Sequence, residues 1–299
     1  MKPIKHLKVK KEMKVSELVK EMGEIGFQAK KLSEAAEILR EMIKDKECKI
    51  FLGLSGAMVP GGMKEVILDI LDYTSVFVTN GANLTHDLIE ALGNKHYIGN
   101  ENEEDFKLNK EGINRIYNVY MKDEVYQDLE KFFDKNWDGL KDNKTIKEFL
   151  WKLGSLIKTK DSILRKCYEN KIPIFCPALA DCGIGLMIWG RKAQGKKIEI
   201  DAFEDMKEII DFAWTSKKKG VFYINGGVPK NFIQQAMQFS SPASYGIQLG
   251  LDRVESGGSG GAPLKEGVSW GKMKEKARFV NVYCDATIAL PLIVAGSFK

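Results

Sequence analysis

The segment Lys49-Ile50-Phe51-Leu52-Gly53-Leu54-Ser55-Gly56 is a near-continuous apolar run that ends in a small polar residue and a glycine. Five more runs of this kind follow, most of them with a helical pattern after them: Val76–Thr79, Ile172–Cys176, Val221–Ile224, Tyr245–Leu249 and Val280–Tyr283. Strands that helices cover on both faces have this composition, whereas strands with one solvent-facing side alternate. The pattern therefore predicts an α/β fold with a doubly wound, mostly parallel, Rossmann-like sheet and right-handed crossovers.

The segments outside these runs are expected to be mainly helical. Two apolar stripes at helical spacing within residues 14–47 predict N-terminal helices over residues 1–47. Residues 100–171 are charged, with scattered tryptophan and phenylalanine, and predict a largely helical insertion between strands. Because no clean linker, repeat or low-complexity tract interrupts the chain, we predict a single domain over residues 1–299.

Composition excludes several classes of function. The net charge of +5 is diffuse, and no basic stripe interleaves with aromatic residues, so nucleic acid is not the expected partner. The five cysteines form no CxxC pair, and none of the three histidines lies at i, i+4 spacing with another, so we expect no zinc site. No apolar segment is long enough for a signal peptide or a membrane span, and we expect a cytoplasmic protein.

The ends of the predicted strands are rich in glycine and small polar residues. Ligands of open α/β sheets bind at the carboxyl ends of the strands, where glycines let backbone N–H groups approach phosphate. A GxGxxG fingerprint and a P-loop are both absent, and each loop taken alone is explained by a tight turn. Four such loops together predict a dinucleotide cleft, for which the candidate cofactor-binding residues are Ser55, Gly56, Asn80, Gly81, Asp181, Gly226, Gly227, Gly257, Asp285 and Ala286.

Two residues are candidates for catalysis. Lys272 ends the segment Val268-Ser269-Trp270-Gly271-Lys272, between a glycine-dense loop and an apolar strand that ends in an acid. Burial against the indole of Trp270 would disfavour the ammonium form and leave an amine able to attack an imine or a carbonyl. His86 follows a glycine-rich strand end. The alternatives stay open for both: a solvated surface lysine, and a histidine that caps or packs a helix.

At this point several segments resemble the deoxyhypusine synthase family, and the resemblance covers most of the chain. The Trp270-Gly271-Lys272 block is the most specific of them. The segments that resemble the archaeal branch are Asn80–Asp87 and Asp285–Leu292. The resemblance also includes residues 26–29, 51–53, 111–116, 173–181, 226–228 and 282–286.

The resemblance implies an enzyme that uses NAD and spermidine. Such an enzyme transfers the 4-aminobutyl group of spermidine to a lysine of the hypusine-bearing translation factor, through an imine on the enzyme lysine that matches Lys272. The residues implied to bind the amine are Trp270, Glu266, Asn231 and Ser259. Family members are homotetramers, so a homotetramer is expected here as well.

This sequence departs from the eukaryotic pattern around the amine. Eukaryotic members have an acid where this chain has Leu186 or Ser259, a histidine where it has Asn231, and a glutamate where it has His86. Gln248 replaces an aromatic hydroxyl. Fewer carboxylates predict weaker holding of a polycation. Because Asn231 cannot accept a proton at neutral pH, we predict that His86 acts as the base.

Two other functions remain open on the sequence alone. A homospermidine synthase or a related aminobutyl transferase would use the same lysine and cofactor with a free polyamine as acceptor. A nucleotide-binding or scaffold protein without activity would give neither NADH nor an amine product.

Overall fold

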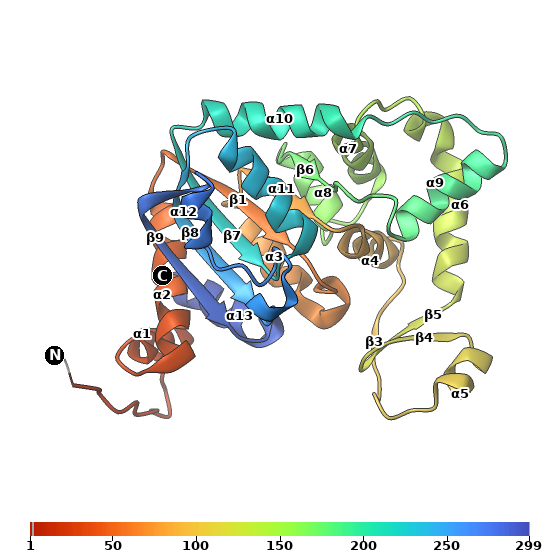
Figure 1. Ribbon diagram of the computed structural model, residues 1–299. Helices are drawn as coiled ribbons and strands as arrows, with labels where there is room; N and C mark the ends of the chain where they lie inside the picture. Colours follow the sequence, from red (N-terminus) through yellow and green to blue (C-terminus); the bar gives the residue numbers. More distant parts are fainter. Residues whose placement is uncertain (2, 299) are drawn as a thin grey trace. The chain divides into compact units, whose positions relative to one another are not determined.

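The computed structural model describes Met1 and residues 3–298, and its central feature is a six-stranded sheet with the order β6-β2-β1-β7-β8-β9 (Figure 1). The strands are β1 (Cys48–Leu54), β2 (Val76–Thr79), β6 (Ile174–Phe175), β7 (Lys218–Ile224), β8 (Ala243–Gly250) and β9 (Met273–Tyr283). β7 runs parallel to both β1 and β8, and β8 runs parallel to β9. The predicted α/β fold is confirmed, and each of the six predicted runs overlaps one of these strands.

The chain divides into two compact units. The first unit comprises Met1–Ser55, Asp69–Val78 and Met206–Lys299, and the second comprises Gly56–Leu68 and Thr79–Asp205. Compactness does not show whether a unit folds by itself, so the single domain stays a prediction. Two helices cross the boundaries between the units in sequence: α3 (Lys64–Leu71) and α10 (Ala202–Thr215).

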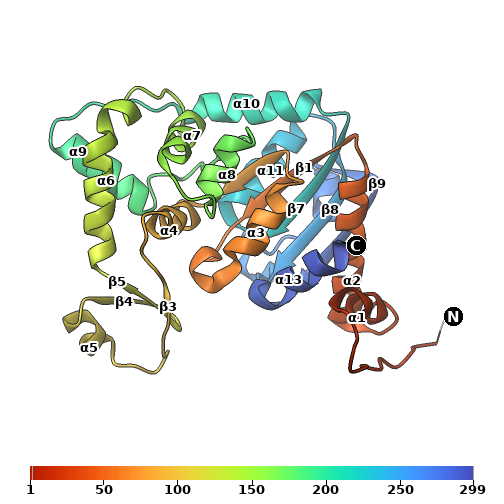
Figure 2. The same ribbon diagram turned by 180° about the vertical axis from the view of Figure 1, so that it is seen from behind.

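In the first unit, helices cover both faces of the strands β1, β7, β8 and β9 (Figures 1 and 2). One face carries α1 (Val15–Met22), α2 (Phe27–Lys44) and α13 (Ala286–Ser297), and the other carries α11 (Gly227–Gln238) and α12 (Glu266–Ser269). Leu52, Phe222 and Ile247 are fully buried in the strands. This burial on both faces explains why the strand sequences are continuously apolar. The 3₁₀ turn η2 (Val254–Ser256) lies between β8 and α12 in sequence.

The second unit is mainly helical. Its helices are η1 (Val59–Met63), α4 (Gly81–Ala91), α5 (Asp105–Lys110), α6 (Glu124–Leu140), α7 (Ile146–Leu156), α8 (Ile163–Glu169) and α9 (Gly183–Ala193). The predicted insertion contains α5 to α8. It also contains β4 (Ile113–Ile116) and β5 (Val119–Lys122), which with β3 (Tyr97–Ile98) form an antiparallel sheet that the sequence did not predict. The hairpin between β4 and β5 turns at Tyr117, which has φ of 54°; a glycine usually occupies such a position.

Across Met1 and residues 3–298, the structure contains no helix with the length and apolar character that crossing a membrane requires.

Candidate active site

A cavity of about 490 Å³ lies in the first unit, and we call it the Lys272 cavity. Its walls come from α11, α12 and the loop between η2 and α12. Its volume suits a small molecule. Six residues predicted from the sequence line it together: Asn231, Gly257, Ser259, Glu266, Trp270 and Lys272.

The backbone of Lys272 is held on both sides. Its N–H donates to the carbonyl of Gly267 at 2.8 Å, and its carbonyl accepts from the N–H of Ala243 at 3.0 Å. Gly271 has φ of 68°, a value that favours glycine, and this turn directs the chain from α12 into β9. The backbone of Lys272 is therefore fixed, and its half-buried side chain extends from this position at the wall of the cavity.

The expected burial of Lys272 against the indole is not found. Trp270 is 55% exposed, and the Lys272 Nζ lies 4.8 Å from the centroid of its ring. A cation at this distance from an indole face is attracted by the ring. The contact is a cation–π arrangement, so the indole by itself supplies no reason for a free amine at Lys272.

Lys230 is a buried lysine in the same cavity that the sequence analysis missed. It is 4% exposed, and its Nζ donates to Gln248 Oε1 at 2.9 Å and to the carbonyls of Ser259 and Ala262 at 2.5 and 2.6 Å. Burial lowers the pKa of Lys230 to about 8, although the charges of Glu266 and Asp252 oppose the shift; the charge of Lys272 acts with burial. Its three N–H donors all have acceptors, so the ammonium form is satisfied near neutral pH.

Gln248 and Lys230 together fix the loop that forms one wall of the cavity. Gln248 is 6% exposed, and its Nε2 donates to the carbonyl of Gly260 at 2.6 Å. The same loop packs on the start of α11, because a Cβ at Gly226 would lie 2.1 Å from the Cα of Gly260. Gln248 is therefore engaged with the protein's own backbone.

In the first unit, the predicted cofactor residues lie at strand ends and helix starts. Ser55 donates its N–H to the carbonyl of Ile224 at 3.0 Å, and a Cβ at Gly227 would lie 3.4 Å from Ser55 Oγ. Ser55 and Gly227 thus meet where β1 and β7 end. No side chain caps the start of α11 at Gly226 in the described part of the chain, which leaves N–H groups free to bind an anion.

The remaining predicted residues of the first unit have local structural contacts. Asp285 caps α13, because its Oδ1 accepts from Thr287 N at 2.8 Å and from Thr287 Oγ1 at 2.5 Å. Ala286 is the first residue of that helix and is buried. Gly257 is exposed and has φ of 68°. Their roles toward a cofactor stay predictions.

In the second unit, Gly56, Asn80 and Gly81 lie around the start of α4. The Gly56 carbonyl accepts from the side-chain amide of Asn80 at 3.4 Å, and a Cβ at Gly81 would lie 2.4 Å from Cys182 Sγ. Packing against Cys182 therefore explains the glycine at position 81 without a ligand. Asp181 is exposed.

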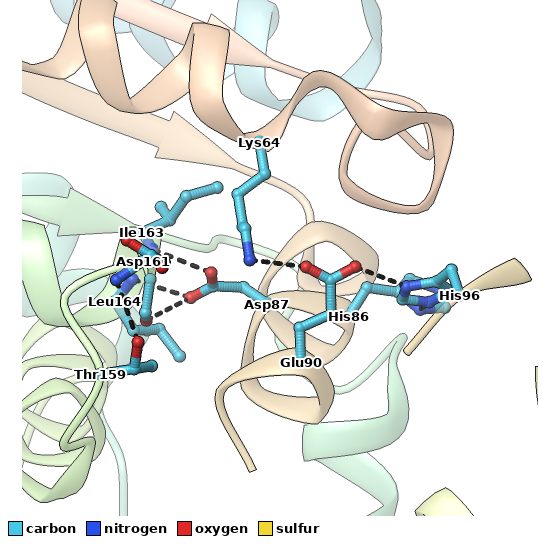
Figure 3. A network of polar contacts seen from close by, with 10 residues as sticks. Lys64, His86, Asp87, Glu90, His96, Thr159, Asp161, Ile163 and Leu164 are labelled. Atoms are coloured by element: carbon cyan, nitrogen blue, oxygen red, sulfur yellow. Dashed lines mark hydrogen bonds and ion pairs between the residues drawn. The ribbon is translucent and has the colours of Figure 1, made fainter. Parts of the chain in front are cut away.

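His86 belongs to a cluster in the second unit and does not line the Lys272 cavity. Asn80 caps α4, because its side chain accepts from Asn83 N at 3.2 Å, so His86 is not the cap. The His86 Nδ1 lies 2.9 Å from the Nε2 of His96, whose Nδ1 lies 2.7 Å from Glu90 Oε1 (Figure 3). Glu90 Oε2 also lies 2.6 Å from the Nζ of Lys64. We call Lys64, His86, Glu90 and His96 the His86 cluster.

The prediction that His86 acts as a base assumed an ordinary histidine pKa, but the pKa of His86 is shifted. Burial lowers it to about 4, the charge of His96 acts in the same direction, and Glu90 opposes both. His86 is consequently neutral at neutral pH. A group with this pKa accepts hydrogen bonds but is a weak base.

Asp87, the next residue, faces α8 on the other side of α4 (Figure 3). It is fully buried and accepts from Ser162 Oγ at 2.8 Å and from the N–H groups of Ile163 and Leu164 at 2.9 Å each. Burial raises the pKa of Asp87 to about 6, although these hydrogen bonds oppose the shift. Asp87 thus satisfies the first N–H groups of α8 from outside that helix.

Comparison with known proteins shows what the chain resembles. The profile of the deoxyhypusine synthase family matches residues 17–297. The "Probable deoxyhypusine synthase 1" of Methanosarcina mazei is 44% identical over 98% of this chain and 94% of its own length. The protein of the same description from Archaeoglobus fulgidus is 42% identical over 96% of this chain and 95% of its own length.

A solved structure supports the fold. The crystal structure described as a "putative deoxyhypusine synthase" from Entamoeba histolytica has a TM-score of 0.65 and 19% sequence identity. The alignment covers 98% of this chain and 96% of that chain. At 19% identity, this similarity supports the fold and nothing further.

Proposed function

This chain belongs to the deoxyhypusine synthase family, and we propose that it uses NAD to transfer the 4-aminobutyl group of spermidine to one lysine of the hypusine-bearing translation factor. One observation supports this proposal above the others. The lysine of the family's Trp-Gly-Lys block lines a cavity together with the candidate amine-binding residues Glu266, Asn231 and Ser259.

We assign the role of nucleophile to Lys272. NAD, when bound, would supply the oxidising power: it would take up a hydride from the carbon beside the secondary amine of spermidine, and the same hydride would reduce the final imine on the acceptor lysine. The Nζ of Lys272 forms a bond to that carbon, 1,3-diaminopropane leaves, and the aminobutyl group remains on Lys272 as an imine. The lysine of the acceptor then displaces Lys272 by attacking the same carbon. Nζ must lose its proton before it attacks, because an ammonium has no lone pair.

The cavity holds an amine mainly through neutral acceptors. Among the described residues that line it, Glu266 is the only carboxylate, and the side chains of Asn231, Gln234, Gln235 and Gln238 contribute amides. Amide carbonyls accept hydrogen bonds from an ammonium without the attraction of a full charge. The structure thus fits an amine that is positioned by hydrogen bonds, with Glu266 as the ionic contact.

The residues at the strand ends of the first unit fit a dinucleotide. The uncapped start of α11 and the exposed Gly227, with φ of 67°, offer backbone N–H groups to a phosphate next to Ser55. We therefore propose that Ser55, Gly226 and Gly227 hold the phosphates, and that Asp285 holds a hydroxyl with the oxygen that does not cap α13. Gly56, Asn80, Gly81 and Asp181 stay candidates for the rest of NAD. We also propose the homotetramer of the family.

Trapping the imine tests the proposed function. The protein is incubated with NAD, spermidine and cyanoborohydride, and we expect a peptide with an aminobutyl group on Lys272. Lys272→Arg keeps the charge but abolishes trapping and transfer, because guanidinium does not deprotonate. Lys265→Arg, at an exposed lysine just before α12, is the matched control and should behave as wild type. Normal transfer by Lys272→Arg would disprove the assignment.

A second incubation identifies the acceptor. It contains NAD and spermidine with either putrescine or the purified translation factor, and mass spectrometry shows which one gains the aminobutyl group. Gain by putrescine alone would establish the homospermidine synthase reaction in place of the proposed one.

A further inference from the structure

Two cysteine sulfurs lie beside one glycine in the second unit. A Cβ at Gly81 would lie 2.4 Å from the Sγ of Cys182 and 3.7 Å from the Sγ of Cys176. Cys176 follows β6, Cys182 precedes α9, and Gly81 is the first residue of α4, so three elements bring these atoms together. All three residues belong to the second unit. The two thiols therefore share one small space, which the glycine at position 81 leaves open.

A tight turn connects the two cysteines. The N–H of Asp181 donates to the carbonyl of Ala178 at 3.0 Å, and the thiol of Cys182 donates to the carbonyl of Leu179 at 3.1 Å. A Cβ at Gly185 would lie 2.5 Å from the carbonyl oxygen of Leu179, so the turn is folded closely against the start of α9. The turn thus reverses the chain and returns Cys182 to the neighbourhood of Cys176.

Cys182 occupies a position that another type of residue normally holds. It is the N-cap of α9, and its Sγ accepts from the N–H of Gly185 at 3.4 Å. Serine, threonine, aspartate and asparagine are preferred at this position, because their oxygens accept hydrogen bonds more strongly than sulfur does. A serine would cap α9 better, so capping by itself does not account for a thiol beside a second thiol.

The two thiols differ in their access to solvent. Cys182 is partly exposed, whereas Cys176 is fully buried. Burial raises the pKa of both thiols above the ordinary value, but at Cys182 the hydrogen bond from the N–H of Gly185 opposes the shift. Cys182 is therefore the thiol that meets an oxidant first, and Cys176 is placed to react with the product.

We propose that Cys176 and Cys182 form a disulfide when hydrogen peroxide oxidises them, and that this bond displaces the start of α9 together with Asp181. The thiolate of Cys182 attacks the peroxide, so that an S–O bond forms, the O–O bond breaks, and the hydroxide that leaves takes up the thiol proton as water. The sulfur of Cys176 then attacks the sulfenic sulfur of Cys182, an S–S bond forms, and a second water leaves. Two electrons pass from the two sulfurs to the peroxide, and a thiol reductant reverses the change.

The disulfide has a consequence for ligand binding that rests on the proposed function. Once bonded to Cys176, the sulfur of Cys182 moves away from the N–H of Gly185 and the carbonyl of Leu179. The turn that carries Asp181, a candidate residue for binding NAD, moves with it. We expect the oxidised protein to bind NAD more weakly by on the order of tenfold, as for the loss of one hydrogen bond to a charged group.

Mass spectrometry of the unreduced protein tests the bond. The tryptic peptide 172–191 contains both cysteines and no other. After treatment with hydrogen peroxide we expect this peptide to be lighter by two hydrogens and to take up no alkylating reagent, and dithiothreitol should reverse both changes. Cys284 is also partly exposed but lies in another peptide, so Cys284→Ser is the control and should form the same bond. A peptide that keeps both thiols, or that gains oxygen at Cys182 while Cys176 stays a thiol, would overturn the proposal.

A pair of variants tests the order of the two steps. Cys176→Ala leaves Cys182 without a second thiol, and we expect dimedone to trap its sulfenic acid in this variant and much less in the wild type. Cys182→Ser supplies an oxygen cap for α9, and buried Cys176 should then stay a free thiol in peroxide. If Cys176 were oxidised in Cys182→Ser as fast as in the wild type, Cys182 would not be the first thiol to react.

Two measurements on the oxidised wild type test the displacement. Amide hydrogens of residues 183–186 should exchange faster than in the reduced protein, because Cys182 no longer accepts from Gly185. Calorimetry should show the weaker binding of NAD, and Cys182→Ser treated with peroxide is the control that keeps its affinity. Equal exchange in the reduced and oxidised proteins would overturn the displacement. A reduced protein that binds no NAD, but forms the disulfide and shows the faster exchange, would refute the proposed function alone.

Discussion

The Lys272 cavity and the His86 cluster differ in how their polar groups are supported. In the cavity, Lys272 and Trp270 come from one short stretch of chain, are partly exposed, and face space for a ligand. In the cluster, the side chains come from α3, α4 and the segment after it, and they bond mainly to one another. Residues of the cavity are therefore free to change partners during a reaction, whereas residues of the cluster and the adjacent Asp87 are held in one arrangement.

Loss of Asp87 should cause the largest change in stability. Asp87→Ala removes the acceptor of Ser162 Oγ and of the N–H groups of Ile163 and Leu164, all of them shielded. At about 1–3 kcal/mol for each unsatisfied group, with partial relaxation, we expect a loss of about 3–5 kcal/mol in the free energy of unfolding. Urea denaturation measures it.

The variant Lys272→Ala serves as the comparison from the cavity. In the described residues the Lys272 side chain has no hydrogen-bond partner, so its removal leaves no polar group unsatisfied. We expect the variant's unfolding free energy to lie within about 0.5 kcal/mol of wild type. If the two alanine variants lost the same stability, the contrast between the two regions would not hold.

The pH dependence of stability should separate His86 from its neighbour Asp87. The folded pKa of His86, about 4, is below its ordinary value of 6.5, so its contribution is complete above pH 6.5 and is lost as the pH falls to 4. The folded pKa of Asp87, about 6, is above its ordinary value of 3.8, so its contribution is complete below pH 3.8 and is lost as the pH rises through 6. Each shift corresponds to about 3 kcal/mol at most.

The two contributions oppose each other in the wild type, and single variants should reveal them. Between pH 4 and 6.5, His86→Gln leaves the effect of Asp87, so its unfolding free energy should fall with pH relative to wild type. Asp87→Asn leaves the effect of His86, and its unfolding free energy should rise. Parallel curves for all three proteins would show that neither group is shifted.

The sequence predicted the sheet because its strands are buried on both faces, and a continuous apolar run expresses that burial directly. It also predicted the residues around Lys272, since the Trp-Gly-Lys block and the glycine-dense loop are each contiguous. It did not predict β3 to β5, because strands of two to four residues around Tyr117 carry little periodicity.

Lys230 and the partners of His86 were missed for a different reason. A lysine in the first turn of a helix is normally exposed, and only the folded loop brings the carbonyls of Ser259 and Ala262 to its Nζ. His96 and Glu90 approach His86 through the course of the chain after α4, which sequence spacing does not encode. Which residues bind NAD or the amine stays a prediction.

Lys230 and Lys272 offer a comparison within one cavity. Lys230→Met leaves Gln248 Oε1 and the carbonyls of Ser259 and Ala262 without their donor, and we expect a loss of about 1–3 kcal/mol in unfolding free energy. The loop from residue 256 to 262 should also become more sensitive to protease. Lys272→Met should cause neither effect. Equal protease sensitivity of both variants would show that Lys230 does not fix the loop.

The smallest expected effect concerns Glu266, the carboxylate of the cavity. Glu266→Gln keeps the shape and removes the charge, and because the side chain is exposed, the charge contributes about 1 kcal/mol or less to holding an amine. We expect calorimetry to show spermidine binding weakened by at most about fivefold at low salt, and by less at high salt, where exposed charges are screened. Glu255→Gln, an exposed acid on η2 that does not line this cavity, is the control. A loss of a hundredfold or more that salt does not reduce would mean that Glu266 becomes buried when the amine binds, and that the cavity of the single chain is not the complete amine site.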